Sequence, residues 1–138
     1  MSKPNFTGRW RFNPEDSRLE IATPDAVVFE IRHSEPSFRF ERILTFGDRT
    51  DKFELELMVG TTSSPFSRGD ATLHPSLKWK ENKLEFMTRI EQGEEESTNL
   101  VVYGLEEDGE LLVAEESFRG PRLSYKNRWV FRKERKRE

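Results

Sequence analysis

Apolar side chains recur at every second position along most of this chain. In the segment 52–59 the odd positions are all Phe, Leu or Val, while positions 52, 54 and 56 are charged. A period of two places successive side chains on opposite faces of a β-strand. The pattern therefore predicts strands with an apolar inner face and a charged outer face.

About nine segments share this alternation. They cover residues 6–12, 27–31, 38–46, 52–59, 77–80, 84–90, 98–105, 111–118 and 123–131. Turn dipeptides such as Gly47-Asp48 and Asp108-Gly109 separate them and permit the positive φ angles of tight hairpins. Sequential antiparallel strands can form a sandwich or a barrel, and closure into a barrel removes exposed edges. We predict one domain over residues 1–138, an all-β, antiparallel up-and-down barrel of nine to ten strands.

Two segments interrupt the alternation. Residues Pro14–Pro24 have room for a helical turn or two between prolines, and residues Gly60–Pro75, rich in Thr, Ser, Pro and Gly, are expected to form a long surface loop. No repeat or linker divides the chain.

Both ends of the chain carry a family resemblance. Residues 6–10 read Phe-Thr-Gly-Arg-Trp, and residues 127–132 read Asn-Arg-Trp-Val-Phe-Arg. These segments resemble the first and last strands of lipocalin-like (calycin) barrels. The resemblance implies that Trp10 packs under an arginine of the last strand, Arg128 or Arg132, and closes one end of the barrel. An arginine over an indole ring would add cation–π energy.

Further motifs resemble small bacterial lipocalin-like proteins of uncharacterised function. They are residues 6–17, 77–84 and 105–111. The last strand departs from the Arg-x-Tyr pair of fatty-acid-binding proteins, because it reads Tyr-Lys-Asn-Arg over residues 125–128. A carboxylate clamp of that type is therefore not expected.

The charge of the chain argues against nucleic-acid binding. Lys and Arg number 23 against 26 Asp and Glu, a formal net charge of −3, and the one dense basic run is expected to be a flexible tail over residues 133–138. No apolar stretch is long enough for a membrane span, and no signal peptide is visible at the N-terminus, so a cytoplasmic location is expected. A periplasmic or secreted location would require a leader that was removed.

The sequence contains no recognisable catalytic motif. Cysteine is absent and there are two histidines, of which His33 is expected to be a structural edge residue and His74 to lie in a loop. A metal site would need carboxylates from several strands. We expect no enzyme activity, no metal and no cofactor.

Two charged residues lie on otherwise apolar faces. Arg42 shares a face with Phe40 and Leu44, and Glu116 shares one with Leu112 and Ala114 if those residues point inward. A buried charge is costly unless it is paired or bound to a ligand. Arg42 and Glu116 either pair with each other or contact the polar group of a ligand.

The barrel predicts a binding function. A closed barrel of this strand number has room for side chains and one small ligand. We expect a small apolar or amphipathic molecule in the interior, entering beside Phe66. The wall residues are expected to be Phe40, Leu55, Leu57, Phe86 and Val102, with Arg42, Glu116 and Tyr125 as polar contacts. The alternative is a filled barrel that binds no ligand and serves as a protein-interaction or scaffold module.

Overall fold

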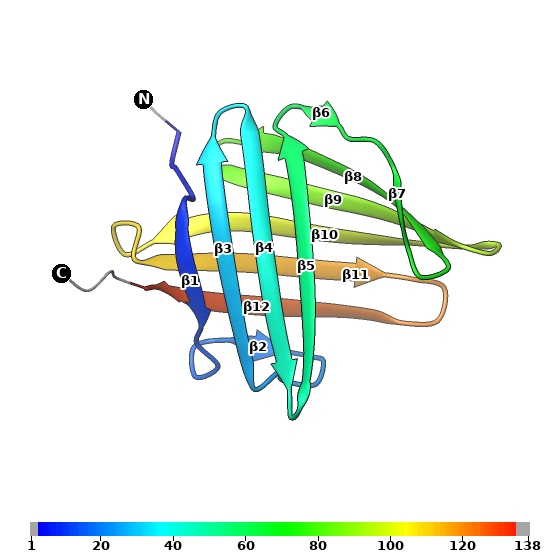
Figure 1. Ribbon diagram of the computed structural model, residues 1–138, viewed down its shortest axis with the longest axis horizontal. Coiled ribbons are helices and arrows are strands. Elements are labelled where there is room, and N and C mark those ends of the chain that lie inside the picture. Colours follow the sequence, from blue (N-terminus) through cyan, green and yellow to red (C-terminus); the bar gives the residue numbers. More distant parts are fainter. Residues whose placement is uncertain (1–2, 135–138) are drawn as a thin grey trace.

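A computed structural model describes residues 3–134 of the chain as two layers of antiparallel strands (Figure 1). The front layer, which contains the strands nearest the N-terminus, consists of β1 (Gly8–Phe12), β3 (Ala26–Ser34), β4 (Ser37–Phe46) and β5 (Arg49–Met58). The rear layer crosses behind it and contains β8 (Ala71–Lys80), β9 (Lys83–Gln92), β10 (Glu95–Glu106), β11 (Leu111–Arg119) and β12 (Ser124–Lys133). Three short strands complete the set: β2 (Arg18–Leu19), β6 (Thr61–Thr62) and β7 (Phe66–Arg68).

One continuous sheet connects the two layers. Its order is β5-β4-β3-β1-β12-β11-β10-β9-β8-β6, with β7 also paired to β8. β1 joins the layers, since Trp10 lies opposite Phe29 on one side and opposite Lys133 on the other. The result is a nearly closed all-β barrel of about ten strands.

The barrel has a seam without backbone pairing. Among the described residues, β5 pairs along its length only with β4, and β6 and β7 pair only with β8. The Gly60 N–H donates to Leu77 O at 2.7 Å, which joins the two sides where β5 ends. Farther along, the sides meet through side chains alone.

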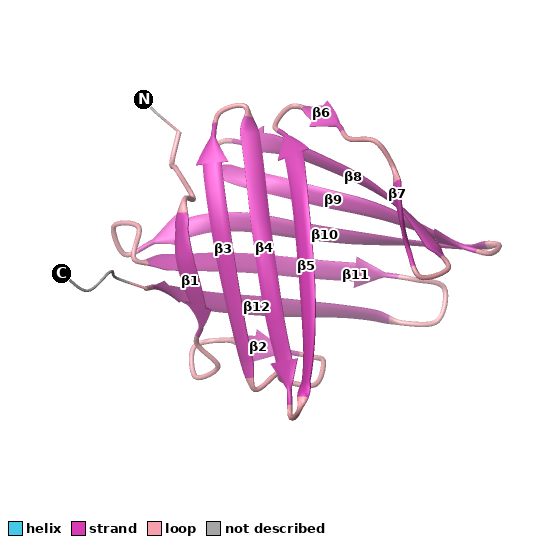
Figure 2. Cartoon of the chain, viewed as in Figure 1, coloured by secondary structure: helices cyan, strands magenta, loops and turns pink. Residues whose placement is uncertain are grey.

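The two segments predicted to be irregular are partly strands. Residues 60–75 contain β6, β7 and the start of β8, so the prediction of a surface loop is wrong for most of this segment, and His74 lies in a strand. Residues 14–24 contain no helix; β2 pairs with β12 there, and Ser17 Oγ accepts from Val130 N–H at 2.9 Å. Figure 2 shows no helix in the described chain, so no helix there is long and apolar enough to cross a membrane.

The interior is lined mainly by aromatic and branched aliphatic side chains. Trp10 and Phe6 are fully buried at one end, which we call the tryptophan end. The Trp10 Nε1–H donates to Phe6 O at 3.0 Å. A Cβ atom at Gly8 would lie 3.1 Å from Lys133 Cε and 3.4 Å from Trp10 Nε1, which explains why glycine precedes this tryptophan.

The prediction that an arginine packs over Trp10 is wrong, because a lysine does so. Lys133 Nζ lies 5.7 Å from the centre of the Trp10 ring and takes that position. Arg128 faces the outside, where it pairs with Glu115 and Glu106, and Arg132 pairs with Asp16. Strand alternation decides this, because odd-numbered residues of β12 point inward.

The C-terminal strand also extends farther than expected. Lys133 ends β12, and the Glu134 N–H donates to Arg9 O at 2.8 Å. A flexible tail therefore does not begin at residue 133; residues 135–138 lie outside the described part of the chain.

Candidate functional site

A small cavity lies inside the barrel between the two layers. Its volume is about 50 Å³. Its lining residues are Val27, Phe29, Arg42, Leu44, Val101, Tyr103, Ala114, Glu116, Trp129 and Phe131. Most of these side chains are apolar, and Arg42 and Glu116 are the two charged ones.

Glu116 is held by three neutral donors. Asn127 Nδ2 and Trp129 Nε1 donate to Oε1 at 2.8 and 2.9 Å, and Asn99 Nδ2 donates to Oε2 at 3.0 Å. Leu112 and Ala114 point inward and are buried in the core, so Glu116, on the same face of β11, lines the cavity. Asn127 also accepts from Glu20 N–H at 2.7 Å, which fixes the segment after β2 against β12.

Arg42 has weaker partners. Its guanidinium lies 5.5 Å from the centre of the Phe53 ring, and its Nε is buried without a hydrogen-bond partner. Within residues 3–134, Arg42 forms no ion pair, so it does not pair directly with Glu116. The interior thus holds a cation and an anion that border one cavity without touching.

Two tyrosines lie on the inner faces of β10 and β12. Burial raises the pKa of Tyr103, with Arg42 opposing and Glu116 adding to the effect. Burial and the Glu116 charge also raise the pKa of Tyr125. Tyr103 lines the cavity, whereas Tyr125 stacks on Phe118 with 5.0 Å between ring centres, outside the cavity lining.

The seam is bridged by side chains at the end of the barrel opposite Trp10, which we call the mouth end. Phe66 of β7 packs on Phe53 of β5, with 6.1 Å between ring centres. Arg68 donates to both carboxylate oxygens of Asp51 at 2.9 and 3.0 Å and lies 4.5 Å from the centre of the Phe53 ring. The Phe53 ring therefore contacts Arg42 inside and Arg68 at the seam.

The predicted wall residues are not grouped at one cavity. Phe40, Leu57 and Phe86 are buried core residues, and Leu55 is partly buried beside them, but none lines the cavity. Val102 was placed on the wrong face: Val101 and Tyr103 belong to the core, and Val102 lies between them on the outer face.

Several cavity residues were missed by the sequence prediction. They are Val27, Phe29, Leu44, Val101, Ala114, Trp129 and Phe131. Each lies in phase with apolar neighbours on its own strand, so alternation places it inside. The pairing between strands decides which inner positions border a cavity.

Both histidines are engaged in hydrogen bonds. His33 Nδ1 accepts from Phe6 N–H at 3.2 Å and its Nε2 bonds Glu35 at 2.8 Å, so it is a buried structural residue at the tryptophan end. His74 bonds Glu91. Within residues 3–134 no group of three or more His, Asp or Glu side chains is placed to hold a metal ion.

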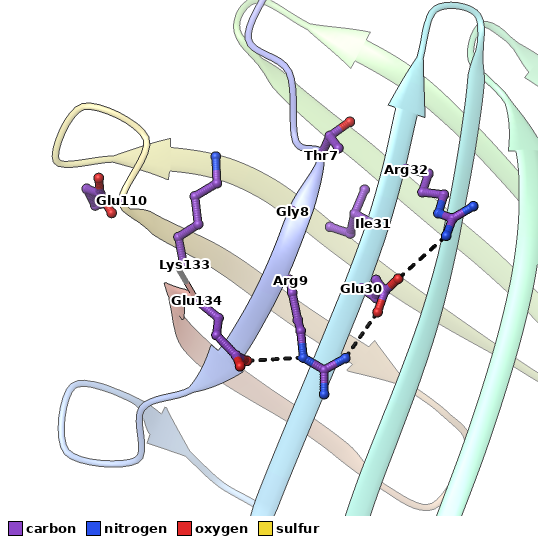
Figure 3. A pocket seen from close by; sticks show the side chains of 9 residues that line it. All are labelled: Thr7, Gly8, Arg9, Glu30, Ile31, Arg32, Glu110, Lys133 and Glu134. Atoms are coloured by element: carbon purple, nitrogen blue, oxygen red, sulfur yellow. Dashed lines mark hydrogen bonds and ion pairs between the residues drawn. The ribbon is translucent and has the colours of Figure 1, made fainter. Parts of the chain in front are cut away.

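A second hollow lies on the outside of the barrel, beside β1 and β3 (Figure 3). Its volume is about 720 Å³ and it is open to solvent. Its charges neutralise one another, since Arg9 pairs with Glu30 and Glu134 at 3.1 Å each, and Arg32 pairs with Glu30 at 3.9 Å. Exposed pairs of this kind are screened by water and contribute little energy.

Comparison with known proteins identifies the fold. No family model and no curated protein sequence matches the chain. Solved structures match over nearly the whole length. Secretory abundant heat soluble protein 4 from Ramazzottius varieornatus is 15% identical with a TM-score of 0.61, over 98% of this chain and 99% of that one.

Two further matches are named for ligands. The REP1-NXSQ fatty acid transporter is 9% identical with a TM-score of 0.64, over 95% of this chain and 97% of that one. Zebrafish ileal bile acid-binding protein complexed with cholic acid is 16% identical with a TM-score of 0.61, over 94% and 98%. At these identities the likeness shows the fold alone, a nearly closed antiparallel β-barrel.

Proposed function

We propose that this chain is a non-catalytic binding protein that holds one small amphipathic molecule inside its barrel. The observation that carries the proposal is the buried Arg42 Nε without a partner at an interior cavity. A buried donor without an acceptor costs about 1–3 kcal/mol, and more when it is charged. A polar group of a ligand would remove this cost.

The neighbours support the same class of function. The names of the fatty acid transporter and the bile acid-binding protein refer to amphipathic molecules. We retain the resemblance to bacterial lipocalin-like proteins, and a cytoplasmic location, as parts of this proposal.

The ligand would contact the cavity through its polar end. Ligand pockets commonly measure about 300–1,000 Å³, whereas this cavity has about 50 Å³. The cavity therefore has room for a head group and a few further atoms. The apolar body would displace half-buried side chains at the mouth end, among them Leu44 and Trp129.

The small volume also favours a second candidate. An interior filled by its own aromatic side chains suits a stable scaffold or protein-interaction module that binds no ligand. The two candidates differ in one measurable property, the presence of a saturable interior site.

Nile red, a neutral apolar dye, tests the proposal. We expect about one dye per barrel, with increased fluorescence. Val101→Phe fills the cavity and should abolish binding, while Val102→Phe, the same change on the outer face one residue away, should leave it intact. Circular dichroism and urea unfolding would verify that both variants fold.

No saturable dye binding by the folded wild type, together with no passenger in native mass spectrometry, would reject the proposal in favour of the scaffold. Equal loss in both variants would place the dye outside the cavity and contradict the interior site.

A further inference from the structure

The interior cavity presents opposite charges to one small space. Arg42 and Glu116 both line it and together have no net charge. In the poorly solvated interior, an added charge on a ligand would be attracted by one group and repelled by the other. A charged head group therefore gains little over a neutral one and still loses its hydration.

The hydrogen-bonding capacity of the cavity further restricts which ligand head group fits. Glu116 receives three N–H donors, and a carboxylate has about four acceptor positions. It therefore keeps capacity for one more donor. Arg42 Nε is a donor without an acceptor. The cavity thus offers one free donor and capacity to accept one hydrogen bond.

The orientation of the Asn99 amide is consistent with this count of unused donors and acceptors. An ionised carboxylate only accepts, so the amide nitrogen of Asn99 must face Glu116. Its Oδ1 is then left buried and without a partner. The polar groups around Glu116 therefore have an unused acceptor in addition to the unused donor of Arg42.

Three kinds of head group can be compared. A carboxylate would accept from Arg42 but would bring a second negative charge toward Glu116 and donate nothing. An ether oxygen would accept but donate nothing. A hydroxyl accepts and donates, so it can satisfy both sides with no net charge.

We infer that the interior site selects an amphipathic molecule with a neutral hydroxyl head group in preference to the matching carboxylate. Arg42 donates to the hydroxyl oxygen, and the hydroxyl hydrogen is donated to the Glu116 side of the cavity. This inference rests on the proposed function and names the chemical class of its ligand.

Displacement of Nile red by three decyl compounds tests the inference. The probes are 1-decanol, decanoate and decyl methyl ether, used at pH 7.4 below their solubility or micelle limits. We expect 1-decanol to bind at least roughly tenfold more tightly than decanoate and several-fold more tightly than the ether, since about 1.4 kcal/mol corresponds to tenfold. Isothermal titration calorimetry would give the dissociation constants.

Two variants should shift the preference in opposite directions. Glu116→Gln removes the negative charge, so decanoate should gain and the preference for alcohol should shrink several-fold. Arg42→Gln removes the positive charge, so the preference should widen. Glu115→Gln is the matched control, because Glu115 is the neighbouring carboxylate on the exposed face and pairs with Arg128.

The experiment distinguishes failure of the proposed function from failure of the head-group inference. If Nile red does not bind the wild type, the proposed function fails and this inference fails with it. If the dye binds but decanoate equals or exceeds 1-decanol, or no decyl compound displaces it, the proposed function stands and the head-group inference is overturned. Equal affinity for 1-decanol and decyl methyl ether would show that bound water, and not the hydroxyl hydrogen of the ligand, satisfies the Glu116 side of the cavity. This result would also overturn the head-group inference.

Discussion

The two ends of this barrel are built differently from the same kinds of residues. At the tryptophan end, Trp10 and Phe6 are fully buried and His33 has partners on both ring nitrogens. At the cavity, Arg42 Nε is buried without a partner, and Oδ1 of Asn99, which bonds Glu116, is buried without a partner as well. One end has its polar groups satisfied, and the other keeps unused hydrogen-bonding capacity.

This difference separates stability from function. The tryptophan end ties the N-terminal segment to the β3–β4 turn: Thr7 Oγ1 donates to His33 O at 3.0 Å and accepts from His33 N–H at 2.9 Å. At the mouth end, the seam is joined by side chains: Phe53 packs on Phe66, and Arg68 pairs with Asp51 and lies over the Phe53 ring. We expect substitutions at the first end to affect folding, and those at the second to affect binding.

The largest effect is expected for Trp10→Ala. Truncation of a fully buried tryptophan typically costs about 3–5 kcal/mol because it leaves a cavity. Urea unfolding should show this loss. Trp129→Phe at the cavity is the comparison, because Trp129 is half-buried and phenylalanine keeps a six-membered ring at this position; it should cost less. It should alter Nile red binding, because it removes the N–H donor to Glu116. A cost for Trp10→Ala as small as that of a surface change would contradict the importance of this end.

A smaller effect on the free energy of unfolding is expected from the ionisation of Glu35 as the pH changes. Burial raises the pKa of Glu35, but hydrogen bonds from Trp79 and His33 outweigh this effect and hold the pKa below its ordinary value of 4.5. A carboxylate with a lowered pKa stabilises the fold above its unfolded pKa, and this contribution is lost as the pH falls through the folded value. The side chain is 47% exposed, so solvent screening keeps the contribution below about 1 kcal/mol.

The measurement compares wild type with Glu35→Gln by urea unfolding between pH 7 and pH 3. The stability advantage of the wild type should be present at pH 7 and should shrink below about pH 4.5. Glu81→Gln, in a turn at the same end, serves as control. An advantage that grew on acidification would contradict the assigned direction.

The smallest change in stability is expected for Asp51→Asn. It removes an exposed ion pair with Arg68, and such pairs contribute about 0.2–1 kcal/mol. The seam should nevertheless open more often, so the amides of β7 should exchange faster with deuterium and Nile red should associate faster. Glu95→Gln, which breaks the exposed Arg122 pair, should change neither rate. Unchanged exchange in Asp51→Asn would show that this pair does not hold the seam.

The sequence predicted the strands and the inner faces well where alternation was uninterrupted. The segment from Lys52 to Val59 lies within β5 and its continuation, and Arg42 borders the interior as its phase predicted. Glu116 also borders it, because the inner face of β11 is the one with Leu112 and Ala114, a choice that the sequence left open. The prediction failed at residues 60–75, because Pro and Ser interrupt the alternation there. The short strands β6 and β7 form by pairing with β8, and the local sequence does not reveal this pairing.

At the candidate site, too, some features could be predicted from the sequence and others could not. A side chain's face follows from its position in the strand, so the buried charges could be recognised locally. Val102 was misplaced by one residue, which reverses the face. The family resemblance implied Arg128 or Arg132 over Trp10, but it does not fix the register that puts Lys133 there.

By itself, the alternation of apolar and charged residues determined the all-β class and the succession of hairpins, because the two-residue period is a property of each strand alone. Only the tertiary structure decided that Lys133 covers Trp10, that Glu116 is taken by Asn99, Asn127 and Trp129, and that Arg42 is left with a free donor. These facts depend on register and on closure of the sheet, which bring together residues far apart in the chain.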